Sequence, residues 1–194
     1  METVEKAYQP LNYGVLYKER WRWLMAGSVA SIGMASFLPW DMHLLFGFAF
    51  AIWLSILALL DCRYGLLYDK LVAPLAAMGL LLAVSGCNAP LTEALPGALL
   101  SGAFLWTLRM ISKGGLGFGD VKFGSAMMLW LNWHAAVVAL FMSFILGGVW
   151  ACALLLCGKG EKGAALPFGP CLAIGAYLAF ICGEECWQAY VGVF

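Results

Sequence analysis

The sequence predicts an all-α integral membrane protein, a polytopic helical bundle with about seven transmembrane segments. Of its 194 residues, 63% are hydrophobic and only 11% are charged, and the apolar residues gather in long runs. This apolar fraction far exceeds the roughly 45–50% of an average soluble protein, and the few charges could not cover the surface of a soluble domain. The formal net charge is zero and no basic cluster is present, which argues against a nucleic-acid-binding protein.

Seven apolar runs could each cross a hydrocarbon core about 30 Å thick. They lie near Trp23–Trp40, Leu44–Leu60, Leu71–Ser85, Leu95–Ile111, Val121–Trp133, Ala135–Cys157 and Pro167–Cys182. The fifth run is the weakest candidate, because it is shorter than the usual minimum of about 17 residues. Six crossings plus a re-entrant segment are therefore the alternative. We treat residues 1–194 as a single integral-membrane domain, because no repeat or separate soluble domain is visible.

The basic residues indicate how the chain is oriented, because cytoplasmic loops of membrane proteins are enriched in Lys and Arg. All eleven basic residues precede the first run or lie in or beside alternate loops after it: Lys6, Lys18, Arg20, Arg22, Arg63, Lys70, Arg109, Lys113, Lys122, Lys159 and Lys162. The intervening loops and the C-terminal tail contain none. We therefore expect a cytoplasmic N-terminal segment over residues 1–22 and an external C-terminus. This segment lacks the features of a cleaved secretory signal, so we expect the first run to be retained.

Two acidic residues differ from the others because they directly adjoin apolar runs. Asp61 ends the second run and Asp120 opens the fifth. Ionisable groups at such depths are energetically costly and are functional candidates. The predicted topology places both at the cytoplasmic face, where they can meet. Two adjacent carboxyl groups in a low dielectric do not both ionise readily, so one can take a proton from water while the other polarises a scissile carbonyl.

A glycine-rich segment precedes Asp120. Four of the seven residues from Lys113 to Gly119 are glycine. Glycine lets the backbone bend and approach a substrate closely, and an extended peptide substrate needs backbone groups to pair with. The alternative interpretation is an ordinary interhelical turn in which Asp120 serves as a helix N-cap.

Three motifs resemble those of the type IV prepilin peptidases, which are bacterial intramembrane aspartyl proteases. The matching segments, in family order, are Leu59-Leu60-Asp61 followed by Asp69, Gly117-Phe118-Gly119-Asp120-Val121-Lys122-Phe123, and Pro167-Phe168-Gly169-Pro170. Tyr68 stands where the family usually has proline. No methyltransferase region with paired CxxC motifs fits before Trp23, so the chain resembles the short, peptidase-only form. We do not expect it to have N-methyltransferase activity.

The resemblance implies that Asp61 and Asp120 are the catalytic residues of an aspartic-type endopeptidase. Its substrates would be prepilin or pseudopilin precursors of a type IV pilus or type II secretion system. Cleavage would occur at the cytoplasmic face of the bacterial inner membrane, between a short basic leader ending in glycine and the hydrophobic segment that follows. Besides this precursor, the expected partner is membrane lipid.

Four further residues are candidates for supporting the site. Gly117 and Gly119 belong to the glycine motif. We predict that Asp69 is the N-cap of the helix over the third run, with substrate contact as the alternative. Lys122 either helps to hold the site or anchors the chain at the membrane interface. Neither charged residue is given a catalytic role.

Two other classes of function stay open. Paired acids in a helix bundle also serve proton or cation transport, but a carrier favours acids near the bilayer midplane rather than at its inner boundary. A non-catalytic assembly factor of a secretion system would be favoured by the loss of one aspartate, and both are present. The seven cysteines form no CxxC pair, and His43 and His134 are expected on the outer side. We therefore expect no metal site and no cofactor.

Overall fold

The computed structural model describes residues 20–37, 42–113, 115–157 and 167–193, and in these ranges the chain forms seven α-helices and no strand. The helices are α3 (Arg20–Phe37), α4 (Met42–Tyr64), α5 (Asp69–Ser85), α6 (Leu91–Ile111), α7 (Phe118–Met128), α8 (Trp133–Leu156) and α9 (Gly169–Val191). Each predicted apolar run corresponds to one helix, and the all-α prediction is confirmed. Residues 1–19, Lys159 and Lys162 lie outside the described ranges.

The exterior of the bundle is that of a membrane protein. By length and composition, α4, α6 and α8 can each cross a membrane. Large apolar side chains point outward, including Leu81, Leu99, Phe141 and Val149, each more than 60% exposed. Such a surface suits lipid rather than water. Helix α7 has only 11 residues and rises about 17 Å at 1.5 Å per residue, so the fifth run is indeed the shortest helix.

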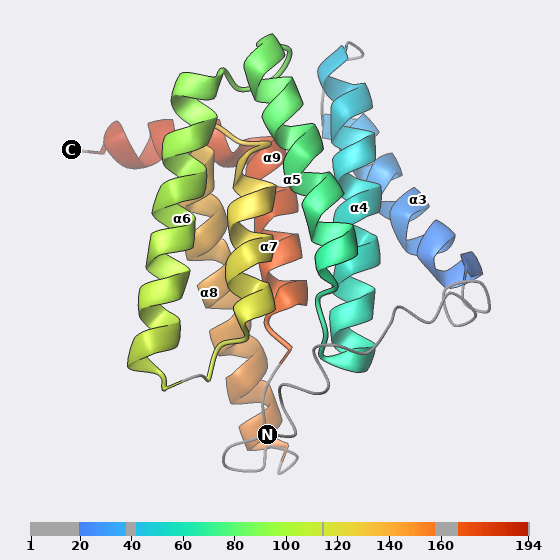
Figure 1. The fold of residues 1–194 in the computed structure, drawn as a ribbon, viewed down its shortest axis with the longest axis vertical. Helices are drawn as coiled ribbons and strands as arrows, with labels where there is room; N and C mark the ends of the chain where they lie inside the picture. The colour runs from blue at the N-terminus through green and yellow to red at the C-terminus, as the bar shows by residue number, and fades with distance from the viewer. Residues whose placement is uncertain (1–19, 38–41, 114, 158–166, 194) are drawn as a thin grey trace.

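The connections place distant parts of the sequence at one end of the bundle. The α4–α5 and α6–α7 connections lie at the lower end in Figure 1, and α9 begins toward that end, whereas the α5–α6 connection lies at the upper end. The end of α4, the beginning of α7 and the beginning of α9 therefore lie at the same end. We call this the α7-start end.

Aromatic packing holds the short α7 in the middle of the bundle. Trp130, just after α7, is 1% exposed, and its ring stacks on Phe50 of α4 with centroids 5.0 Å apart. The Trp130 indole N–H donates to the Leu75 carbonyl of α5 at 3.0 Å, and the Asn88 amide donates to the Trp130 carbonyl at 2.7 Å. These contacts fix the C-terminal end of α7 against α4 and α5, so the position of its first turn is determined as well.

Candidate active site

Two buried aspartates come together at the α7-start end. Asp61 lies in the last turn of α4 and is 5% exposed, and Asp120 lies in the first turn of α7 and is 8% exposed. They are close enough for the charge on Asp61 to act on Asp120. Carboxylates are rarely buried to this extent without compensating partners. The partners that hold each one therefore decide what the pair can do.

The beginning of α9 holds Asp61. The backbone N–H of Gly169 donates to Oδ2 of Asp61 at 2.9 Å, in a buried contact. A Cβ atom at position 169 would lie 2.6 Å from that same oxygen, which is far inside van der Waals contact, so the position requires glycine. Pro170 follows in the first turn of α9, where the missing N–H of proline removes no intrahelical hydrogen bond.

Asp120 is held by the segment that precedes it. Its Oδ2 accepts a hydrogen bond from the backbone N–H of Gly117 at 3.1 Å, and a Cβ on Gly117 would lie 2.9 Å from that oxygen. Gly117 is itself the N-cap of α7, so the alternative reading of Asp120 as an N-cap is wrong. Asp120 instead makes the return contact of a capping box from the third helical position.

One oxygen of the pair is left without a protein partner. Oδ1 of Asp120 is buried and has no hydrogen-bond partner within the described part of the chain. Most buried polar atoms in folded proteins are paired, so this oxygen is an unused hydrogen-bond acceptor. The surrounding atoms cover it, so a water molecule or a substrate group can reach it only when those atoms move.

Gly119 lets the first turn of α7 approach the α4–α5 connection. A Cβ at this position would lie 3.0 Å from Cβ of Leu67 and 3.6 Å from the Leu67 carbonyl oxygen. Leu67 follows α4 in the chain, so the contact ties the helix that carries Asp120 to the segment next to Asp61. The two glycines of the motif therefore have different tasks: Gly117 binds the carboxylate, and Gly119 allows this close approach.

Each aspartate also lies beside a helix N-terminus, although Asp61 itself belongs to the last turn of α4. Asp61 accepts from the first residue of α9, and Asp120 sits in the first turn of α7. The N-terminus of a helix carries a partial positive charge and stabilises nearby anions. Two such ends at one place offset part of the repulsion between the carboxylates. This explains how the fold tolerates two acidic side chains so close together.

Arg109 is a third charged contributor that the sequence did not single out, except as a marker of topology. Its guanidinium donates a hydrogen bond to the Leu116 carbonyl and lies 5.7 Å from the centre of the Phe118 ring. Its positive charge acts on Asp120. Arg109 thus holds the segment leading into α7 from the end of α6.

The prediction that Asp69 is an N-cap is wrong. Helix α5 begins at Asp69, earlier than the apolar run indicated, so Tyr68 and not Asp69 is its N-cap. The Tyr68 side chain makes no capping hydrogen bond. Asp69 instead forms an ion pair with Lys122 of α7 at 2.7 Å. The Lys122 ammonium also lies 5.1 Å from the centre of the Phe118 ring. This contact favours the interpretation that Lys122 holds the region of the site.

Both histidines lie at the opposite end of the bundle. His43 lies in the first turn of α4, and its ring packs against Phe180 with centroids 5.1 Å apart. His134 lies in the first turn of α8, and its Nδ1 lies 3.7 Å from a carboxylate oxygen of Glu184. Among the residues described, no group of three or more His, Cys, Asp or Glu side chains could hold a metal ion. The groups that interact with the two aspartates include backbone amides, the Arg109 guanidinium and the thiols of Cys62 and Cys171.

Comparison with known proteins identifies the family. The type IV leader peptidase family matches residues 48–152, a range that includes both aspartates, Asp69, Lys122 and the glycine motif. The chain is 32% identical to a prepilin leader peptidase/N-methyltransferase of Stutzerimonas stutzeri over 140 residues, which cover 70% of this chain and 48% of that protein.

Two further relatives bear the same name. The proteins of Aeromonas salmonicida and Pseudomonas aeruginosa are 33% and 31% identical to the chain over 140 residues, with the same coverage of 70% and 48%. The chain therefore spans about half the length of the curated relatives it matches. No solved structure gives a significant match. The family match extends over more than half of the sequence, and the chain belongs to the type IV leader peptidase family.

Proposed function

We propose that the chain is an intramembrane aspartyl endopeptidase that removes the short basic leader from type IV prepilin-like precursors. The observation that carries this proposal is the pair of buried aspartates at the α7-start end. Each is held through one oxygen by a backbone N–H, and the buried Oδ1 of Asp120 has no hydrogen-bond partner among the described residues. The family and the names of the relatives support a precursor of this kind as substrate.

The pair can carry out peptide hydrolysis without a covalent intermediate. The ionised carboxylate takes a proton from a water molecule, and the resulting hydroxide adds to the scissile carbonyl carbon, while the protonated carboxyl donates a hydrogen bond to the carbonyl oxygen. The C–N bond of the tetrahedral intermediate then breaks, and the leaving amine receives a proton from the pair. Water is consumed, and both carboxyl groups return to their starting states.

The electrostatics of the site suit a pair in which one carboxyl group is ionised and the other is protonated. The two carboxyl groups share one low-dielectric site, so they bind and release protons as a unit. The helix N-termini and Arg109 stabilise the single negative charge that the pair must keep. The same groups oppose full protonation, so one carboxylate stays available as a base.

We also propose that the α7-start end faces the cytoplasm, in the bacterial inner membrane. The support is the distribution of Lys and Arg, which alternates between successive connections as the positive-inside rule requires. Five of them, Arg63, Lys70, Arg109, Lys113 and Lys122, lie at or beside the α7-start end. A precursor with a basic leader inside the cell would present its scissile bond at this depth.

The test is precursor cleavage by purified variants in detergent. Asp61→Asn and Asp120→Asn keep the size of each side chain and remove its carboxyl chemistry, so we expect each to lower the cleavage rate by about a thousandfold or more. The matched control is Glu184→Gln at the opposite end, which we expect to cleave at the unchanged rate. Near-normal turnover by either aspartate variant, in protein of normal fold, would contradict the proposal and favour transport or assembly.

A further inference from the structure

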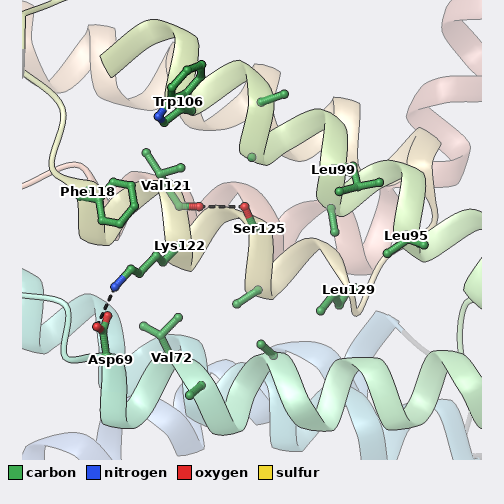
Figure 2. A pocket seen from close by; sticks show the side chains of 16 residues that line it. Asp69, Val72, Leu95, Leu99, Trp106, Phe118, Val121, Lys122, Ser125 and Leu129 are labelled. Atoms are coloured by element: carbon green, nitrogen blue, oxygen red, sulfur yellow. Dashed lines mark hydrogen bonds and ion pairs between the residues drawn. The ribbon is translucent and has the colours of Figure 1, made fainter. Parts of the chain in front are cut away.

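A groove of about 890 Å³ lies between α5, α6 and α7. Figure 2 shows α7 between the other two helices, with side chains from all three facing the same space. We call this the α5–α6–α7 groove. Its only charged members among the described lining residues are Asp69 and Lys122. The groove is therefore apolar except where this ion pair sits.

The groove starts at the α7-start end, but neither aspartate lines it, because Asp120 lies about 200° around α7 from Phe118 and Lys122. Val121 and Lys122, which directly follow Asp120 in α7, both line it, and Phe118 lies at the same end. Leu95 and Leu129 lie at the other end (Figure 2). The lining thus changes from charged to apolar with increasing distance from the proposed site of cleavage.

The dimensions of the groove match part of a helix. Its lining on α6 extends from Leu95 to Trp106, which corresponds to about 17 Å, or about three helical turns. Small side chains face it, including Ala73 and Ala103, and small residues let a second helix approach closely in a membrane. At its floor α6 and α7 already touch, because a Cβ on Gly102 would lie 2.5 Å from the Ser125 hydroxyl.

We propose that the α5–α6–α7 groove seats the hydrophobic segment of the precursor, as a helix of about three turns. The proposal rests on the proposed function and adds the place where the substrate is held. An apolar segment that begins directly after the scissile bond would match a lining that becomes apolar with distance from the α7-start end. The Asp69–Lys122 pair marks this boundary, with side chains 68% and 41% exposed, so charged residues of the leader stay outside the groove.

Filling the groove tests this assignment. Ala73 and Ala103 are both exposed lining residues, so tryptophan can be placed there without invading the packed core. We expect Ala103→Trp and Ala73→Trp to lower cleavage of a membrane-embedded precursor by about tenfold or more. A short peptide that spans the scissile junction but lacks the hydrophobic segment should be cleaved by these variants at the unchanged rate. The matched control is Ala153→Trp, an exposed position on α8 outside the groove.

The two substrates separate the inference from the proposed function. If the unaltered protein cleaves neither substrate, the proposed function fails. If it cleaves the precursor and Ala103→Trp does so equally well, the groove assignment fails while the function stands. Equal losses on the precursor and on the short peptide would also overturn the assignment, because the substitution would then act on catalysis itself.

Direct contact can be measured with a photoreactive amino acid at position 103. In the Asp120→Asn background, which should bind the precursor without turnover, we expect cross-links from position 103 to the hydrophobic segment of the precursor. The same probe at position 153 should give none. Cross-links from position 103 only to lipid, or only to a second copy of the chain, would overturn the proposal.

Discussion

Both ends of the bundle carry carboxylates, but these differ in burial and in the groups that donate hydrogen bonds to them. At the α7-start end, Asp61 and Asp120 are buried, and their partners are backbone amides. At the opposite end, Glu184 is 47% exposed, and Asn132 and Gln188 donate side-chain hydrogen bonds to it at 3.0 and 3.3 Å. Asp61 and Asp120 are thus a pair held by the backbone, whereas Glu184 is an ordinary carboxylate at a helix surface.

Backbone donors constrain a carboxylate more than side-chain donors do, because the backbone cannot move without moving its helix. The position of Asp61 depends on where α9 begins, and that of Asp120 on the segment that leads into α7. Side chains such as Asn132 and Gln188 can adjust to a change at Glu184. We therefore expect substitutions near the two ends to differ sharply in their effect on cleavage.

Among substitutions of residues that hold the aspartates, the largest effect should come from adding one methyl group beside Asp61. In Gly169→Ala the new Cβ would lie 2.6 Å from Oδ2 of Asp61, so the carboxylate or the start of α9 must shift. We expect the cleavage rate to fall by about a hundredfold, since small misplacements of reacting groups have effects of this size. The control is Gly148→Ala on α8, where nothing lies within 4 Å of the added atom. Equal activity of the two variants would show that the Gly169 contact does not position Asp61.

A smaller effect is expected at Arg109, which acts through the segment before α7. Arg109→Leu removes the hydrogen bond to the Leu116 carbonyl and the positive charge that acts on Asp120. We expect a loss of about tenfold in cleavage rate, corresponding to about 1.4 kcal/mol, with partial recovery in Arg109→Lys, which restores only the charge. Identical rates for Arg109→Lys and Arg109→Leu would indicate that charge has no part in the effect.

The smallest effect at this end is expected for the ion pair between α5 and α7. Both side chains are substantially exposed, and exposed ion pairs contribute about 0–1 kcal/mol. Asp69→Asn should therefore retain cleavage within about fivefold of the unaltered protein and shift thermal unfolding only slightly. Complete loss of cleavage in normally folded Asp69→Asn would show that this carboxylate is also needed for catalysis. It would contradict the assignment of catalysis to Asp61 and Asp120 alone.

Much of the helical layout could be predicted from the sequence, because long apolar runs must either be buried in the protein or face lipid. The run before Asp61 and the run after Asp120 were enough to predict helices that carry each residue. Alternation of basic residues predicted one shared face, and the structure places both residues at one end of the bundle. The short fifth helix was also foreseen, since its run is too brief for an ordinary crossing.

The partners of the aspartates could not be predicted in the same way. The contact between Gly169 and Asp61 joins residues 108 positions apart, and no local pattern specifies it. The error at Asp69 came from a helix boundary, which depends on backbone geometry rather than on where hydrophobicity begins. Arg109 was interpreted through topology alone, because its contacts with Leu116 and Phe118 require the connection between α6 and α7 to fold back.

The central claim is that Asp61 and Asp120 act as one catalytic unit, and a double-mutant cycle on precursor cleavage tests it most directly. Groups that act as a unit show strongly non-additive losses. We predict that Asp61→Asn, Asp120→Asn and the double variant share the same residual rate, at least about a thousandfold below that of the unaltered protein. Losses that multiply in the double variant, or near-normal cleavage by either single variant in protein of unchanged fold, would contradict the claim.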